Sequence, residues 1–147
     1  MQVKRIVALV LSVITLCAAM GVTVYASDEQ TVIIEEIVSS YELADSLTNT
    51  LSITSSTANC CSYCTAYSNV VHVSVTQTLQ KFWGLWIWED VDGAEWSGNE
   101  DGNSIGLYRS KSGLLNGTYR LKSVFTLKTA SGKTETITIY SEEKTVS

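Results

Sequence analysis

From Leu51 onward, the chain alternates apolar and polar residues with the period of a β-strand. The clearest examples are the segments 71–76, 118–128 and 136–140. Successive side chains of a strand point to opposite faces, so each of these segments offers one apolar and one polar face. Such strands bury their apolar faces against a second layer and leave the polar faces in water. The alternation therefore restricts the chain to sheet-on-sheet architectures.

Residues that favour turns separate the alternating segments. We expect turns at 95–103, at Asn116-Gly117 and at Ser131-Gly132, where glycine and asparagine tolerate a positive φ. The pattern predicts an all-β fold for residues 48–147, an antiparallel β-sandwich of the immunoglobulin-like kind with six to seven strands. In this fold we expect Tyr119 to be a corner tyrosine whose hydroxyl binds back to the preceding loop.

The first 26 residues have the features of a secretory signal peptide. Lys4 and Arg5 precede an apolar run, and the small residue Ala26 stands before Ser27 at an acceptable cleavage site. The alternative is a membrane anchor, but the strongly apolar run is shorter than the ~20 residues of a spanning helix and no basic residues follow it. We expect a secreted, extracellular protein that has no membrane attachment after cleavage.

Residues 27–47 are acidic, and we expect them to form a spacer or a short helix before the sandwich. Removal of Lys4 and Arg5 would leave eight basic residues against 15 acidic ones, a net charge of −7. A protein with this balance has no basic stripe with which to bind phosphates. The composition therefore excludes nucleic acid as a partner.

Four strand-like segments carry a resemblance to other proteins, namely Ile53-Thr54-Ser55 and the segments 75–81, 117–122 and 134–141. In these segments the chain resembles an uncharacterised family, a domain of unknown function, of small secreted β-rich proteins from Gram-positive gut bacteria. The similarity extends over residues 51–146. The resemblance implies a β-sandwich and export, and it implies no activity because the family has none assigned.

Three cysteines, Cys60, Cys61 and Cys64, lie within five residues. In an exported protein the default state of such cysteines is a disulfide bond. Adjacent cysteines bridge only with strain, so we expect Cys64 to pair with Cys60 or Cys61 and to leave one thiol free. The alternatives are zinc binding together with His72, a redox Cys61-x-x-Cys64 motif, and reduced thiols in an anaerobic setting; the structural context for the zinc or the redox site is not visible. We therefore predict no metal and no cofactor at these cysteines.

All four tryptophans lie within fourteen residues, at Trp83, Trp86, Trp88 and Trp96. If 82–88 is a single strand, Trp83 faces opposite to Trp86 and Trp88. We favour burial of most of the cluster, because tryptophan is heavily buried on average. In the alternative, Trp86 and Trp88 form an exposed pair that binds a polysaccharide or another surface protein, as in a carbohydrate-binding or adhesin-like module.

The segment 89–103 is rich in carboxylates, and Asp90 and Asp92 are weak candidates for calcium ligands. The spacing does not match an EF-hand loop, so we expect a solvated acidic loop. A serine hydrolase would need His72 as its base, and no Gly-x-Ser-x-Gly elbow occurs. The sequence therefore predicts a non-enzymatic extracellular or cell-surface module with a binding or structural role. A small secreted hydrolase is the least favoured alternative.

Overall fold

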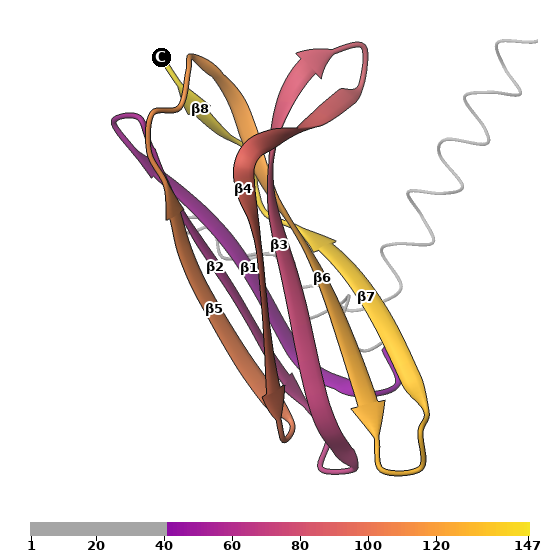
Figure 1. Cartoon of the computed structure of the whole chain (residues 1–147). Coiled ribbons are helices and arrows are strands. Elements are labelled where there is room, and N and C mark those ends of the chain that lie inside the picture. The colour runs from indigo at the N-terminus through magenta and orange to yellow at the C-terminus, as the bar shows by residue number, and fades with distance from the viewer. Residues whose placement is uncertain (1–40) are drawn as a thin grey trace, which may run out of the picture. The chain divides into compact units, whose positions relative to one another are not determined.

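The computed structural model describes residues 41–147, which form eight β-strands and no helix (Figure 1). None of these residues belongs to a helix that could cross a membrane. The predicted signal peptide and the spacer up to residue 40 lie outside the described residues. The strands are β1 (Ala44–Thr54), β2 (Thr57–Ala66), β3 (Val70–Gly84), β4 (Ile87–Asp101), β5 (Ser104–Lys111), β6 (Gly117–Thr129), β7 (Thr134–Tyr140) and β8 (Lys144–Val146).

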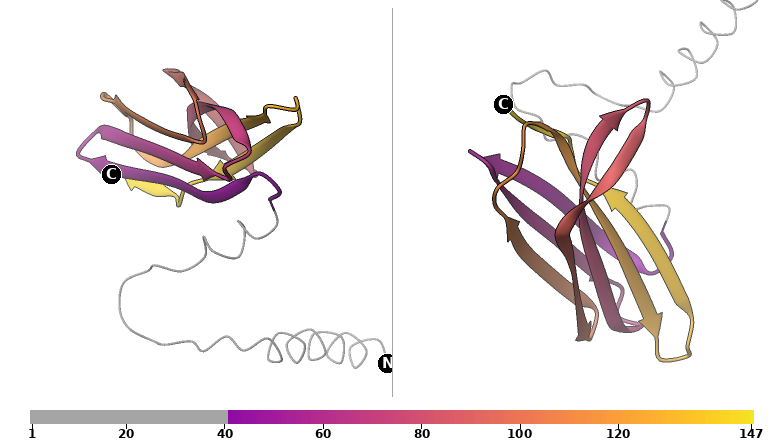
Figure 2. Two further views of the ribbon diagram at one scale, coloured as in Figure 1. Left: turned by 90° about the horizontal axis from the view of Figure 1, so that it is seen from below. Right: turned by 45° about the horizontal axis from the view of Figure 1, so that its top comes forward.

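The strands form two antiparallel sheets that face each other as two layers (Figure 2). The small sheet has the order β1-β2-β5, and the large sheet has the order β4-β3-β6-β7 with β8 paired to β6. The predicted antiparallel β-sandwich is therefore confirmed, with eight strands instead of six or seven. The chain changes sheet between β4 and β5 at Gly102-Asn103. It also changes sheet between β2 and β3 and between β5 and β6. Together these changes place β1, β2 and β5 opposite β3, β6 and β7, as in immunoglobulin-like sandwiches.

The sandwich begins earlier than the expected boundary at residue 48. Strand β1 starts at Ala44, and Leu43, Ala44 and Leu47 are buried. The pairing of β1 with β2 shifts register between Ala44 and Ser46, and this irregularity lets apolar residues at helical spacing all reach the core. The last residues of the expected spacer are therefore part of the fold.

The interior contains two apolar clusters, one toward each end of the strands. The lower cluster, near the start of β1, includes Cys64 and Phe125, and the upper cluster, near the end of β1, includes Cys60 and Leu121. Tyr119 is buried in the upper cluster, and its hydroxyl donates a hydrogen bond of 2.6 Å to the carbonyl oxygen of Leu115. The predicted corner tyrosine is therefore confirmed.

Four buried polar residues separate the two clusters, and we call them the polar belt (Asn49, Ser62, Gln77, Ser123). Each comes from a different strand and lies between the inward residues of the two clusters on that strand. The Nδ2 of Asn49 donates to the carbonyl oxygens of Leu121 at 2.9 Å and Ile139 at 3.3 Å. Its Oδ1 accepts from the hydroxyls of Ser62 and Ser123, both at 2.9 Å. The Nε2 of Gln77 donates to Ser62 Oγ at 2.7 Å and to the Leu107 carbonyl oxygen at 2.9 Å.

Candidate functional site

The tryptophan-rich segment is a β-hairpin, so the single strand through 82–88, on which the expected spacing of the tryptophans depended, does not form. Strand β3 ends at Gly84, Leu85 and Trp86 make the turn, and β4 starts at Ile87. Both turn residues have a positive φ, 51° for Leu85 and 65° for Trp86. Two-residue turns of this kind normally use Asn-Gly, because a bulky side chain is strained at positive φ. The hairpin therefore holds two large apolar residues where the backbone disfavours them.

Five large apolar side chains are exposed at this hairpin, and we call them the apolar tip (Phe82, Trp83, Leu85, Trp86, Ile87). The exposed fraction is 94% for Trp86 and 88% for Leu85. In Figure 1 the hairpin projects at the end of the sandwich opposite the connection between β2 and β3. The tip is thus a contiguous apolar protrusion, which a soluble protein rarely exposes without a partner.

A large bulge in β4 sets the direction of the hairpin. Thr78 pairs with Glu95 and Gln80 pairs with Asp90, so the segment 91–94 lies opposite Leu79 alone. Bulges bend the strand that carries them and change the direction of the side chains that follow. The end of the hairpin therefore turns away from the plane of the large sheet, as Figures 1 and 2 show.

The structure divides the four tryptophans into two pairs, whereas we expected burial of most of the cluster. Trp83 and Trp86 are exposed, while Trp88 and Trp96 are partly buried. Trp96 packs against both apolar clusters, and Trp88 lies over the Arg120 guanidinium at 4.1 Å. The predicted strand-spaced pair of Trp86 and Trp88 does not form, because the turn interrupts the alternation between them.

A chain of side-chain contacts fixes the base of the hairpin to the large sheet. The Arg120 guanidinium lies 4.1 Å from the ring centre of Trp88 and 4.2 Å from that of Tyr140. Its Nε donates to Gln80 Oε1 at 2.9 Å, and Gln80 Nε2 donates to Asp90 Oδ1 at 2.8 Å. Contacts of a cation with two aromatic faces and a charged hydrogen bond hold the planar guanidinium in one orientation. The apolar tip therefore stands on a fixed base that spans β4, β3, β6 and β7.

The acidic segment is part of a strand, and the expected loop at 95–103 is wrong. Strand β4 continues to Asp101, so only Gly102-Asn103 lies outside the strands. Asp90 and Asp92 are exposed on this edge strand, where charges oppose pairing with another sheet. Within residues 41–147, no group of three or more histidine, cysteine, aspartate or glutamate side chains is placed to hold a metal ion. His72 Nδ1 lies 2.8 Å from Asp101 Oδ1 on the exposed surface.

The three cysteines of β2 are free thiols, so the predicted local disulfide is wrong. Cys60 and Cys64 face the interior, and Cys61 faces outward. Three steps along a strand, from Cys61 to Cys64, span ~10 Å and four steps span ~13 Å, and both exceed the ~7 Å between Cα atoms that a disulfide can bridge. Burial raises the pKa of the Cys60 thiol to about 11 and that of Cys64 to about 12. The alternation of small inward residues over 58–66 was the sequence signal for this arrangement.

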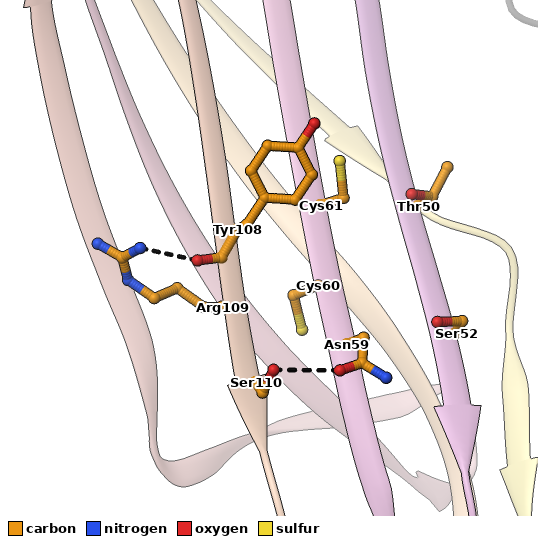
Figure 3. A pocket seen from close by; sticks show the side chains of 8 residues that line it. All are labelled: Thr50, Ser52, Asn59, Cys60, Cys61, Tyr108, Arg109 and Ser110. Carbon is orange, nitrogen blue, oxygen red and sulfur yellow. Dashed lines mark hydrogen bonds between the residues drawn. The ribbon is translucent and has the colours of Figure 1, made fainter.

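A shallow hollow of about 380 Å³ lies on the small sheet (Figure 3). Figure 3 shows the Cys61 side chain beside the Tyr108 ring, and interaction with this neighbouring thiol is the main cause that raises the pKa of Tyr108. Ser110 Oγ donates to Asn59 Oδ1 at 3.1 Å, and Arg109 is turned away. Sequence reasoning missed this site. The hollow is lined by Thr50, Ser52, Asn59, Cys60, Cys61, Tyr108, Arg109 and Ser110.

No protein-family model matches the sequence, and no similar curated protein was found. The resemblance to a family of small secreted β-rich proteins therefore stays a prediction. Function must be inferred from the two surface features of the sandwich, the apolar tip and the hollow.

Proposed function

We propose that the protein is a secreted, non-enzymatic binding module that inserts the apolar tip into an apolar recess of a partner protein. The exposure of five large apolar side chains on one hairpin, two of them in a strained turn, supports this proposal. Burial of each large side chain in the recess would contribute ~1.5–3 kcal/mol. Strained backbone is commonly found where function requires it.

The chemistry of the tip favours a protein partner over a sugar. A sugar platform needs open aromatic faces that lie side by side, but Arg120 covers a face of Trp88 and Leu85 stands between Trp83 and Trp86 in the chain. Mixed aliphatic and aromatic side chains fit the recesses in which tryptophan acts as an interface anchor. A lipid surface is disfavoured, because an anionic bilayer repels a chain whose net charge is −5, or −7 once the signal peptide with Lys4 and Arg5 is removed.

The test is the double variant Leu85→Asn with Trp86→Gly, which installs the residue pair that this turn prefers. Photo-crosslinking from position 83 in the extracellular fraction of the source cells would identify the partner, whose affinity is then measured with purified proteins. We expect the variant to fold at least as stably as the parent and to bind the partner at least about tenfold more weakly.

Tyr67→Ser is the matched control, because Tyr67 is an exposed aromatic residue at the opposite end of the sandwich. It should leave partner binding unchanged. Equal partner binding by the tip variant and the parent would refute the proposal. The secretion part of the proposal is tested separately by N-terminal sequencing of protein from the medium, which should begin at Ser27.

A further inference from the structure

The outer face of the small sheet carries no charged side chain in its three central rows. The registers of β1 with β2 and of β2 with β5 define these rows, because they place one residue of each strand side by side. This is unusual for a chain with 25 charged residues among 147. The rows are Thr48, Tyr63 and Gly106; Thr50, Cys61 and Tyr108; and Ser52, Asn59 and Ser110.

Two tyrosine rings meet above a glycine on this face. A Cβ atom at Gly106 would lie 3.2 Å from Tyr63 Cδ2 and 3.6 Å from Tyr108 Cε2, so glycine leaves room for both rings. Both tyrosines are exposed, and the exposed fraction of Tyr108 is 67%. The rings therefore form an aromatic surface at one side of the hollow.

Half of the residues that line the hollow have short hydroxyl or amide side chains. Thr50, Ser52 and Ser110 can each donate and accept a hydrogen bond, and Asn59 adds an amide. Ser110 already donates to Asn59 Oδ1, which orients the amide so that its Nδ2 can donate to a ligand. The volume of about 380 Å³ is in the range of small-ligand sites.

We infer that this face is a second binding site, which goes beyond the proposed function of the tip, and that its ligand is a neutral glycan. A pyranose ring can stack its C–H face on Tyr108 while its hydroxyls exchange hydrogen bonds with the short polar side chains. The three central rows carry no charge, and Arg109, the one charged residue that lines the hollow, turns away and donates to the Tyr108 carbonyl oxygen at 2.7 Å. This arrangement matches an uncharged ligand, because a charged one would lose its water without gaining an opposite charge.

The free thiol of Cys61 provides a reporter inside the hollow. The full chain is treated with N-ethylmaleimide in the absence and presence of maltoheptaose, cellopentaose or chitotetraose at millimolar concentration. We expect at least one of these neutral oligosaccharides to slow the alkylation of Cys61, and anionic polygalacturonate to have no effect. Cys60 and Cys64 are buried and should not react in the folded protein.

Variants assign the protection to the proposed face. The affinity for the protecting oligosaccharide, measured by calorimetry, should fall about tenfold or more in Tyr108→Ala. Tyr67→Ala, which removes an exposed tyrosine elsewhere, should retain it, and so should the double variant of the tip. Failure of all three oligosaccharides to bind, equal binding by polygalacturonate, or unchanged affinity in Tyr108→Ala would overturn the inference. Loss of glycan binding in the tip variant would also overturn it, because the two sites would then be one.

Discussion

The apolar tip and the polar belt depart from the usual division of side chains in opposite ways. The belt places Asn49, Ser62, Gln77 and Ser123 in the interior, whereas the tip places tryptophan and leucine in water. The belt residues find hydrogen-bond partners in their own chain. The tip side chains are left largely to solvent. The contrast teaches that the belt is stabilised by contacts within this protein, apart from the Oε1 atom of Gln77, which has no hydrogen-bond partner within residues 41–147, whereas the exposed side chains of the tip make few such contacts.

The belt also fixes the register of the strands. Its four residues lie on β1, β2, β3 and β6, so both sheets contribute to one network. A shift of one strand by two residues would keep its faces but would move a polar side chain into an apolar cluster. Such a shift would leave a polar group buried without a partner, which costs about 1–3 kcal/mol. The belt therefore selects one register among those that the alternation alone permits.

The largest expected effect is the pH dependence of stability, which tests whether water is excluded from the apolar clusters on either side of the belt. The folded-state pKa values of Cys60 and Cys64, about 11 and about 12, lie above the ordinary value of 9.0. The unfolded chain therefore loses these protons first as the pH rises. The resulting stability is fully present below pH 9, and it falls by several kcal/mol toward the folded pKa values.

Denaturant titrations at pH 8 and near pH 11 measure this loss. The double variant Cys60→Ala with Cys64→Ala serves as the comparison, since it keeps the tyrosines and lysines that also titrate there. Its stability should fall less steeply with pH than that of the parent. Parallel curves for the two proteins would mean that water reaches the thiols and that the clusters are not dry.

The next largest effect is expected from Asn49→Leu. The substitution keeps the approximate size of the side chain but removes its four hydrogen bonds, to the carbonyl oxygens of Leu121 and Ile139 and to the hydroxyls of Ser62 and Ser123. The two hydroxyls keep the bond of 2.7 Å between them. We expect a loss of about 3 kcal/mol in the free energy of unfolding, because four hydrogen bonds of one interior network are lost together. Chemical denaturation measures it, with exposed Asn99→Leu as the control. A loss below about 1 kcal/mol would contradict the view that the hydrogen bonds of the belt stabilise the interior.

Gln77→Leu should cost less than Asn49→Leu. The Oε1 atom of Gln77 is buried and has no hydrogen-bond partner in the described part of the chain. The substitution removes two hydrogen bonds of Nε2, which lowers the free energy of unfolding, but it also removes the unpaired oxygen, which raises it. We therefore expect a net loss of about 1 kcal/mol in the free energy of unfolding. Denaturation of both variants under one set of conditions ranks them. The reverse order would show that Gln77, not Asn49, organises the belt.

The smallest effect is expected at the tip. The indole of Trp86 is exposed, and the residue has a positive φ that does not favour a bulky side chain. We therefore expect Trp86→Ser to change the free energy of unfolding by less than about 0.5 kcal/mol. Thermal and chemical denaturation test this. Marked destabilisation would mean that Trp86 packs against its own domain, and the contrast with the belt would then disappear.

Local periodicity predicted the sandwich because β3, β6 and β7 each have one wet and one dry face. It failed at 82–88, where an apolar run on both faces fits a central strand as well as a hairpin. Gly84 was the only local sign of a turn, since Leu85-Trp86 is not a turn pair. The contacts that hold the hairpin base, such as Arg120 with Trp88, come from residues distant in sequence.

The cysteines and the hollow were missed for different reasons. A cysteine at an inward strand position looks the same in sequence as half of a disulfide, and only the extended geometry of β2 separates the two. The hollow depends on the register that brings Thr50, Cys61 and Tyr108 into one row across three strands. No single segment contains that row, so no local pattern could reveal it.

The central position of β3 has a mechanical consequence. This strand leads into the tip, and it pairs with β4 on one side and β6 on the other. Strand β1 begins near the far end of the sandwich, where the Tyr67 amide donates to the Leu43 carbonyl oxygen. A pull between the start of β1 and a partner held at the tip would run along the strands. The hydrogen bonds flanking β3 would then be loaded in shear, all together, so the domain would transmit tension and would not unzip.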